Sequence, residues 1–498
     1  MKWVFLAILW LGTHIYATGQ QSWLIWTKKP LSDTDIKHFQ TFFPEPAEIE
    51  RIGQTFTIYR LTAPQSSLSK LEILSLLRQN ELIFAFSPDI KVALRTNGTN
   101  DPELSNQWHL QNFQYAIRAI SAWDTMRTIM RPDTFVIAII DAGFDTSHQD
   151  ILFAFNWADT VDGIDNDGNG FVDDFRGWNF ELNSPGISSH WHGTLVAGIA
   201  GAKTDNGIGV AAPPLNIARI LPVVVGNPYN DSVLLSRVVQ AYDYVYTLRL
   251  MWDTSGGTVG LPIVATNISM GIDGANPNDY PLWCQMYDSL GKLGILSVAA
   301  TSNNIVNVDL VGDMPTTCPS QWLISVTGTD QNGNLIGAYG ETHIDIAAPG
   351  TGIYSTWLGN TYSSSSGTSF AAPQVAAMIP VALSLVPDSI YNAYWTDPEI
   401  YSLLLKRFIL KTITRYADSK PTQTNGIVNM DWLVKVSARA DTTIVGLQLP
   451  EFTYRNVPQV SFTIDGKMLS SYDKYHISKP VIIIENREKR LIMPQRTH

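Results

Sequence analysis

The sequence predicts an α/β protein with a mostly parallel sheet and helices on both faces, preceded by a small α+β unit and followed by a short β-rich tail. From Trp108 onward, continuous apolar runs alternate with helical segments. An unbroken apolar run is expected of a strand buried on both faces, and alternation of strands with helices builds a parallel sheet. The apolar runs are 135–140, 218–225, 263–270, 295–300 and 323–327, and the helical segments include 232–251 and 280–290.

The composition is that of a protein with a large core. Of the 498 residues, 45% are hydrophobic and 16% are charged, which argues against wholesale disorder. The formal net charge of -11 and the lack of a basic stripe argue against binding to nucleic acid. The two cysteines, Cys284 and Cys318, allow at most one internal disulfide, and two buried free thiols are the alternative.

Residues 1–17 have the anatomy of a signal peptide. A positive start at Lys2 is followed by an apolar segment to Leu11 and a small-residue cleavage site at Ala17. This pattern predicts export, with the mature protein secreted or held at the cell surface, where a disulfide is permitted. An uncleaved membrane anchor is the alternative. No later segment is predicted to be apolar for long enough to span a bilayer stably.

Residues 18–100 are predicted to form a compact α+β unit. Segments 22–26, 55–61 and 82–94 have strand-like patterns, whereas 33–42 and 67–79 have helical spacing, the first with Ser32 as its cap. The polar stretch 95–102 is typical of an exposed linker, and such linkers are where proteolytic nicking concentrates.

Four polar residues lie at predicted strand ends or helix starts of the α/β region. Asp141 follows the run 135–140, Asn303 follows the run 295–300, His192 begins a small-residue helix, and Ser369 precedes an apolar helix. Chemistry in such sheets gathers at the carboxyl ends of the strands. Each residue alone is more simply explained as a turn, cap or core residue, but together they indicate a site. Serine, histidine and a carboxylate suit acyl transfer, and an amide can help to hold the oxyanion.

The apolar run 375–385 predicts a buried helix directly after this serine. Thr368 or Ser369 is the expected N-cap, and Pro373 suits the first turn. Pro380 is expected to kink the helix or to end it early.

These motifs resemble the subtilisin-like serine peptidases, in which the triad also runs in the order Asp, His, Ser. The resemblance spans about residues 101–440 and implies a secreted endopeptidase that acts on polypeptides with Asp141, His192 and Ser369 as its triad. It further implies that Asn303 donates to the oxyanion and that Ser269, Met270 and Gly271 pair with an extended substrate. The segments that carry the resemblance are 139–143, 192–194, 267–271, 347–350 and 367–373.

Three positions depart from the family pattern. Ala142, Leu195 and Ser302 stand where the family usually has Ser or Thr, His, and Gly. No triad member is lost, so we expect an active enzyme that needs no cofactor for catalysis. The alternative is a catalytically inactive protein that binds peptides. The family also implies that residues 18–100 are a propeptide, which assists folding and inhibits its own enzyme until it is cut between Ala93 and Leu104.

The loop 162–174 spaces oxygen-bearing side chains at alternate positions around glycines. Asp165, Asp167 and Asn169, with a carboxylate from Asp173 or Asp174, are candidate ligands for a structural calcium ion. The start resembles an EF-hand loop without its closing glutamate, and a polar surface loop is the alternative.

After residue 440 the pattern turns to β structure. The strand candidates are 460–464, 481–484 and 490–492. Hairpins of this kind resemble the C-terminal sorting tails of type IX secretion in bacteria, and a small β cap on the enzyme is the alternative.

Overall fold

The computed structural model describes residues 21–41, 47–63, 70–89, 98–227 and 232–440, with four short strands in the tail. The chain divides into two compact units, Met1–Arg95 and Thr96–His498. The predicted signal peptide, residues 1–17, lies outside the described residues, as does most of the predicted tail.

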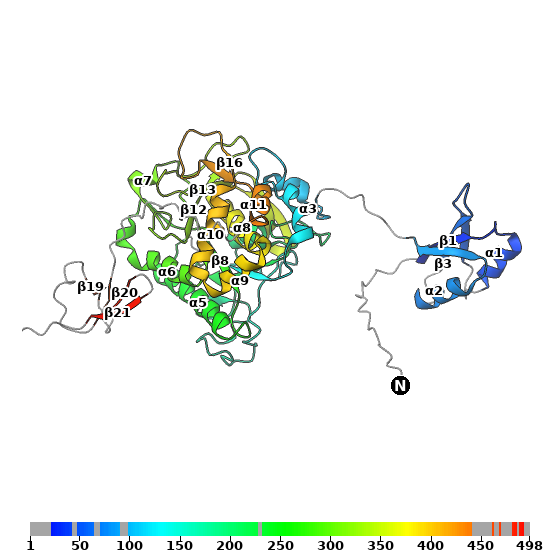
Figure 1. The fold of residues 1–498 in the computed structure, drawn as a ribbon, viewed down its shortest axis with the longest axis horizontal. Coiled ribbons are helices and arrows are strands. Elements are labelled where there is room, and N and C mark those ends of the chain that lie inside the picture. The colour runs from blue at the N-terminus through cyan, green and yellow to red at the C-terminus, as the bar shows by residue number, and fades with distance from the viewer. Residues whose placement is uncertain are drawn as a thin grey trace, which may run out of the picture. The chain divides into compact units, whose positions relative to one another are not determined.

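The N-terminal unit is a four-stranded antiparallel sheet with two helices (Figure 1). The strands lie in the order β2-β3-β1-β4, so the two halves of the βαββαβ chain interleave. Ser32 caps α1 in a reciprocal capping box with Asp35, as the sequence predicts. The elements are β1(Gln21–Thr27), α1(Asp33–Gln40), β2(Glu48–Arg51), β3(Ile58–Ala63), α2(Lys70–Gln79) and β4(Ile83–Pro88).

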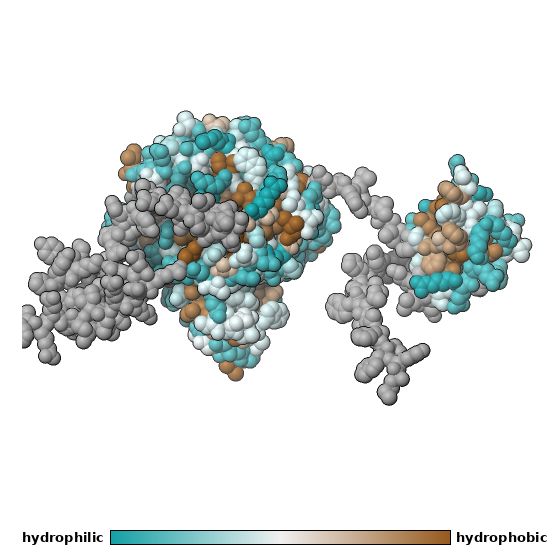
Figure 2. Space-filling model, viewed as in Figure 1, coloured by the Kyte–Doolittle hydropathy of each residue, from teal (hydrophilic) through white to brown (hydrophobic). Residues whose placement is uncertain are grey.

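This unit has its own core and an aromatic surface. Trp23 and Ile25 of β1 are buried, whereas Trp26, one residue on, is exposed because successive strand residues face opposite sides. The Trp26 ring meets Phe56 and Phe84 edge to face, with centroids 5.2 and 5.1 Å away. Apolar residues gather on the visible face of this unit (Figure 2).

A mostly parallel sheet forms the centre of the larger unit, as predicted, and it has nine strands (Figure 1). Its order is β16-β17-β13-β12-β10-β8-β5-β7-β6, and all neighbours are parallel except β16 and β17. The strands are β5(Phe135–Asp141), β6(Trp178–Asn179), β7(Ala218–Val224), β8(Ile263–Ile268), β10(Leu296–Ala300), β12(Leu323–Thr329), β13(Ile346–Pro349), β16(Ile413–Arg415) and β17(Gly426–Val428).

Helices cover both faces of this sheet. Alternate residues of β5 point into different hydrophobic cores. Ile137 and Ile139 lie in the core shared with α3(Ala119–Ile129), α4(Trp191–Gly201), α8(Ala372–Leu385), α10(Pro398–Lys411) and α11(Met430–Ser437). Val136 and Ile140 lie in the core shared with α5(Leu235–Thr254) and α6(Pro281–Lys292). Burial on both faces explains why the strand is apolar at every position. The unit also contains the helices α7(Val308–Val311) and α9(Asp388–Thr396).

Helix α8 differs from its prediction at its start, and Pro380 does not end it early. Its N-cap is Ala371, which follows a 3-10 turn, η5(Thr368–Phe370), and among the described residues no side chain caps either element. Within the described residues, Thr368–Leu385 is apolar and long enough to span a membrane, so the expectation of no such later segment is wrong by length and composition; 94% of it is buried in the protein.

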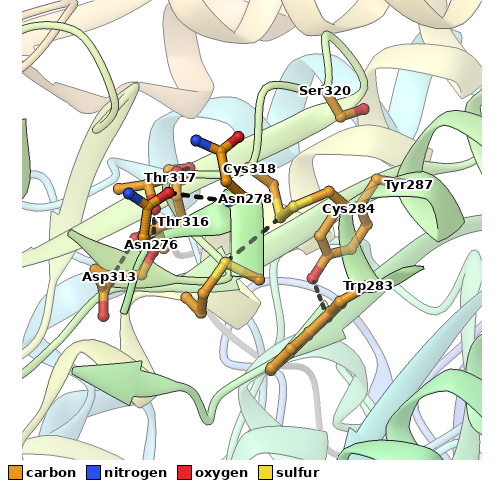
Figure 3. Close-up of a disulfide and its surroundings, with 12 residues drawn as sticks. Asn276, Asn278, Trp283, Cys284, Tyr287, Asp313, Thr316, Thr317, Cys318 and Ser320 are labelled. Carbon is orange, nitrogen blue, oxygen red and sulfur yellow. Dashed lines mark hydrogen bonds between the residues drawn. A yellow bond between two sulfur atoms is a disulfide. The ribbon is translucent and has the colours of Figure 1, made fainter. Parts of the chain in front are cut away.

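Smaller elements surround the sheet edge. The pair β9(Ile272–Asp273) and β11(Asp313–Met314) is antiparallel, as is the hairpin β14(Ile353–Trp357)–β15(Thr361–Ser365). A disulfide joins Cys284 of α6 to Cys318 after β11, beside a Trp283–Tyr287 hydrogen bond (Figure 3). In the tail, β18(Ser461–Phe462) pairs with β19(Met468–Leu469), and β20(Val481–Glu485) with β21(Glu488–Ile492).

Candidate active site

Asp141 and His192 meet at the carboxyl end of β5. Asp141, the last residue of the strand, is fully buried, and His192 lies in the first turn of α4 with 19% of its side chain exposed. Its Nδ1 lies 2.9 Å from Oδ1 and 3.0 Å from Oδ2 of the carboxylate. This contact assigns the proton of the neutral imidazole to Nδ1, which leaves Nε2 as the basic nitrogen.

Ser369 lies in the turn η5, which packs against α4. The ring of the next residue, Phe370, is 5.5 Å from the His192 ring between centroids. The Ser369 hydroxyl donates to the carbonyl of Ser269 at 3.3 Å, and the Ser269 hydroxyl donates back to the Ser369 carbonyl at 3.0 Å. The candidate nucleophile, the imidazole and the predicted substrate segment are thus neighbours.

Asn303 follows β10, two strands from β5, and its side chain is held by Thr368. The Thr368 backbone N–H donates to Oδ1 of Asn303 at 2.9 Å, and the Thr368 hydroxyl lies 3.1 Å from the same oxygen. Since the amide is planar, these contacts turn its NH₂ group away from Thr368. Asn303 is exposed, so this donor can meet an incoming oxygen atom.

The segment Ser269, Met270 and Gly271 follows β8, the strand between β5 and β10. A Cβ on Gly271 would lie 2.1 Å from the carbonyl oxygen of Met314, so only glycine fits there. The three predicted substrate-binding residues therefore run along the same sheet end as Asp141 and Asn303.

The departures from the family pattern have local explanations. The backbone N–H of Ala142 donates to Asp141 Oδ1 at 2.7 Å, which supplies a donor where a hydroxyl side chain is missing. Leu195 is fully buried in the core that contains α4. The Ser302 hydroxyl donates to Asp273 at 2.8 Å, so this side chain fixes the backbone that precedes Asn303.

A sequence profile of the subtilase family matches residues 133–428, more than half of the chain and all of the residues above. The chain belongs to the subtilase family. Thermitase from Thermoactinomyces vulgaris is 31% identical over 56% of this chain and 83% of its own length.

Other relatives of this subtilase are proteases by name. An extracellular protease of Xanthomonas campestris is 29% identical over 67% of this chain and 58% of its own length. Subtilisin-like protease 1 of Plasmodium berghei is 28% identical over 59% of this chain and 49% of its own length. The chain therefore spans about half the length of several curated relatives. The solved epidermin leader peptide processing serine protease of Staphylococcus aureus shares the fold, with a TM-score of 0.50 and 16% identity over 85% of this chain and 100% of that one.

Of the predicted calcium ligands, Asp167, Asn169 and Asp174 are joined by hydrogen bonds, whereas Asp165 and Asp173 accept backbone N–H groups. Both carboxylate oxygens of Asp165 accept backbone N–H groups of the loop itself, between residues 168 and 170. Asp173 Oδ1 accepts the N–H groups of Asp162 and Gly163 at 2.8 Å each. Within the described ranges, no group of three or more His, Cys, Asp or Glu side chains is placed to hold a metal ion.

Asp167 approaches Asp174, the second of the two predicted closing carboxylates, with Asn156 between them. The Asn156 amide donates to Asp167 Oδ2 at 2.8 Å and to Asp174 Oδ1 at 2.6 Å, and Asn169 donates to both carboxylates. Burial raises the pKa of the Asp174 carboxyl to about 7, although the Tyr244 hydroxyl donates to it. The buried Oδ1 of Asn156 has no hydrogen-bond partner among the described residues.

Two residues that position the candidate active site were not predicted from the sequence. Thr368 orients Asn303, yet in the sequence it resembles an ordinary helix cap. His190 caps α4 through its Nδ1, which accepts the His192 N–H at 3.3 Å. A histidine two positions before a candidate catalytic histidine is the only sequence signal for that second role.

Proposed function

We propose that this subtilase is an exported serine endopeptidase that hydrolyses peptide bonds through a Ser-His-Asp triad and an acyl-enzyme. The observation that carries the proposal is the contact of the buried Asp141 carboxylate with Nδ1 of His192, beside the turn that bears Ser369. A carboxylate in this place orients the imidazole and stabilises the cation that forms when Nε2 accepts a proton.

In the proposed reaction, the Ser369 oxygen attacks the substrate carbonyl carbon while His192 Nε2 takes the hydroxyl proton. The hydroxyl must first turn away from the Ser269 carbonyl, its acceptor in the unliganded protein. The Asn303 NH₂ group and the Ser369 N–H stabilise the oxyanion. His192 then protonates the leaving amine, and water hydrolyses the acyl-enzyme by the same proton transfers in reverse. Side chains and water suffice, without a cofactor.

A serine-directed fluorophosphonate tests this function, because only an activated serine reacts. We expect the purified protein to gain one label, located on Ser369 by peptide mass, and to hydrolyse a casein substrate. Ser369→Ala should abolish both signals. Ser364→Ala, which changes an exposed serine of β15 nearby, is the matched control and should retain them.

The rival function is that of a catalytically inactive subtilase that binds extended peptides at Ser269, Met270 and Gly271. A protein that binds peptides but neither takes the label nor cleaves would support this rival and overturn the proposed activity.

We further propose that residues 18–100 act as a propeptide that inhibits the enzyme until it is cut between Ala93 and Leu104. The support is the compact fold of the N-terminal unit and the unit boundary after Arg95. N-terminal sequencing of the wild type and of Ser369→Ala tests self-processing. A wild type that still begins near Gln20 would contradict it. Export by residues 1–17, and type IX secretion by the tail, rest on sequence patterns alone.

Calcium also remains a proposal, centred on Asp167 and Asp174, two of the ligands that the sequence suggested. Asp167 and Asp174 share the Asn156 NH₂ group, and a cation in that position would let Asn156 present its unpartnered Oδ1 instead. Calorimetric titration of the purified protein with Ca²⁺ should give heat that Asp167→Asn removes and Asp173→Asn preserves. No heat with the wild type would remove the site.

A further inference from the structure

Two carboxylates face each other at the end of the predicted substrate segment. Asp273 and Asp313 are directly opposite in the β9–β11 pair, and β9 begins immediately after Gly271. Like charges opposite each other in a sheet destabilise it, so their juxtaposition needs an explanation.

Both carboxylates are tied to the segment that carries Asn303. Asp313 Oδ2 accepts the Thr301 hydroxyl at 2.8 Å and the Ser302 N–H at 3.3 Å, as well as the hydroxyl of Thr316 (Figure 3 shows Asp313 with Thr316). Asp273 Oδ2 accepts the Ser302 hydroxyl and the Asn304 amide, each at 2.8 Å. The two acids are therefore fixed next to the oxyanion donor.

Neither acid forms an ion pair with another residue that the structure describes. Asp313 is 1% exposed, and burial, with a smaller contribution from the Asp273 charge, raises the pKa of its carboxyl to about 6. Every hydrogen bond to the Asp313 carboxylate within the described residues goes to Oδ2, so Oδ1 can accept another donor. A buried, uncompensated carboxylate favours binding of a cation.

The reaction geometry places one substrate side chain near this pair. We call the residue whose carbonyl carbon is attacked the acyl residue. Its carbonyl must lie between Ser369 and Asn303, and its backbone runs along Ser269–Gly271. Its side chain then lies between the segments 269–273 and 301–304, which Asp273 and Asp313 link.

We propose that Asp273 and Asp313 make this subtilase select lysine or arginine as the acyl residue of its substrates. This inference rests on the proposed endopeptidase function and names its substrate class. Asp273, which is exposed, meets the cation first, and the buried Asp313 supplies the second negative charge.

The chain itself contains a matching substrate. Within 93–104, the window where propeptide cleavage is expected, Arg95 is the single basic residue. The boundary between the two compact units also falls between Arg95 and Thr96. For cleavage after Arg95, the Arg95 guanidinium would bind beside Asp273 and Asp313. The cut would then separate the two units at their boundary.

A matched substrate series tests the specificity. The purified enzyme, first shown to take the fluorophosphonate label, is assayed on peptides that differ only in the acyl residue: lysine against norleucine, and arginine against its uncharged isostere citrulline. We expect kcat/KM to favour the charged member of each pair by about 10- to 100-fold, the range of a hydrogen bond to a charged group.

Two variants and one control locate the effect. Asp273→Asn and Asp313→Asn should each bring the charged-to-neutral ratio towards one, and the exposed position of Asp273 keeps the test valid if the buried variant fails to fold. Asp124→Asn changes the net charge equally on α3 and should leave the ratio unaltered. Equal cleavage of neutral and charged peptides by the labelled wild type, or a ratio unaffected by Asp273→Asn, overturns the inference but not the peptidase function. Failure of both labelling and cleavage overturns both.

N-terminal sequencing of the processed protein is the second test. We expect Thr96 as the first residue, slower processing in Arg95→Met and normal processing in Arg95→Lys. A wild-type N-terminus that follows a neutral residue would contradict the proposed specificity. The same cut in Ser369→Ala would show that another protease makes it.

Discussion

Replacement of Asn303 tests the proposed oxyanion site most directly. The Thr368 N–H, 2.9 Å from Oδ1, fixes the amide so that its NH₂ group is the free donor. Asn303→Ala removes that donor and should cost about 2.7–4 kcal/mol of transition-state stabilisation, a range that includes subtilisin itself. Asn303→Asp keeps an oxygen for Thr368 but places a negative charge near the oxyanion. At about 4 Å and an effective dielectric constant near 20, the repulsion adds up to about 4 kcal/mol.

The assay is steady-state hydrolysis of one peptide, with active enzyme counted by fluorophosphonate titration. We expect kcat to fall by about 100- to 1,000-fold in Asn303→Ala with little change in KM, because the interaction forms only in the transition state. Asn303→Asp should be slower still. Asn392→Ala, at an exposed position of α9, is the control. Melting curves are needed as well, because loss of Oδ1 leaves the buried Thr368 N–H unpaired, at a cost of about 1–3 kcal/mol.

Two results would refute this reasoning. If Asn303→Ala lost less than about tenfold in kcat, the side chain would not be a principal oxyanion donor. If Asn303→Asp were faster than Asn303→Ala, the amide orientation inferred from the Thr368 contact would be wrong.

Four further predictions follow from the described contacts. Asp141→Asn should lower kcat by about 10⁴-fold with the fold intact, as measured by hydrolysis and circular dichroism, because the amide favours the wrong imidazole tautomer. Cys284→Ser opens a link of sequence separation 34 and should lower the denaturant-measured free energy of unfolding by about 3–4 kcal/mol; no change would discount the disulfide. The lysine-to-norleucine ratio of kcat/KM should rise from pH 5 to pH 7, because the pKa of Asp313 is about 6 and only its ionised form attracts lysine; a flat ratio would exclude this carboxylate, since His192 acts on both substrates alike. Gly271→Ala should raise KM and lower the melting temperature, because the new methyl group would lie 2.1 Å from a carbonyl oxygen; an unchanged KM would show that the substrate binds elsewhere.

Local patterns predicted much of the fold. The apolar runs at 135–140 and 323–327 became β5 and β12, because strands buried on both faces are apolar at every position. The cap of α8 was predicted wrongly. Thr368 has the residue type of a cap, but its hydroxyl lies 2.5 Å from the Thr301 carbonyl, and the turn η5 moves the helix start to Ala371. A residue's propensity for capping does not indicate which distant acceptor competes for its hydroxyl.

The calcium loop shows the same limit. Alternate acids predicted a convergence of side chains. Asp167 and Asp174 do approach each other, but Asp165 and Asp173 accept backbone N–H groups of the loop. A loop can satisfy its carboxylates with its own backbone, and spacing alone does not distinguish this from coordination of a metal.

The sequence by itself determined the order of strands and helices and the residue types at the strand ends. The reason is that the local spacing of apolar residues indicates which face of each element is buried. The tertiary structure alone decided which of those side chains meet: Ser269 and Ser369 are 100 residues apart and exchange hydrogen bonds, and Asp273 faces Asp313 across a two-residue ladder. Whether a carboxylate receives a cation, a hydroxyl or a backbone N–H depends on chain segments that fold beside it. The substrate preference proposed for this subtilase could therefore be derived only from the folded chain.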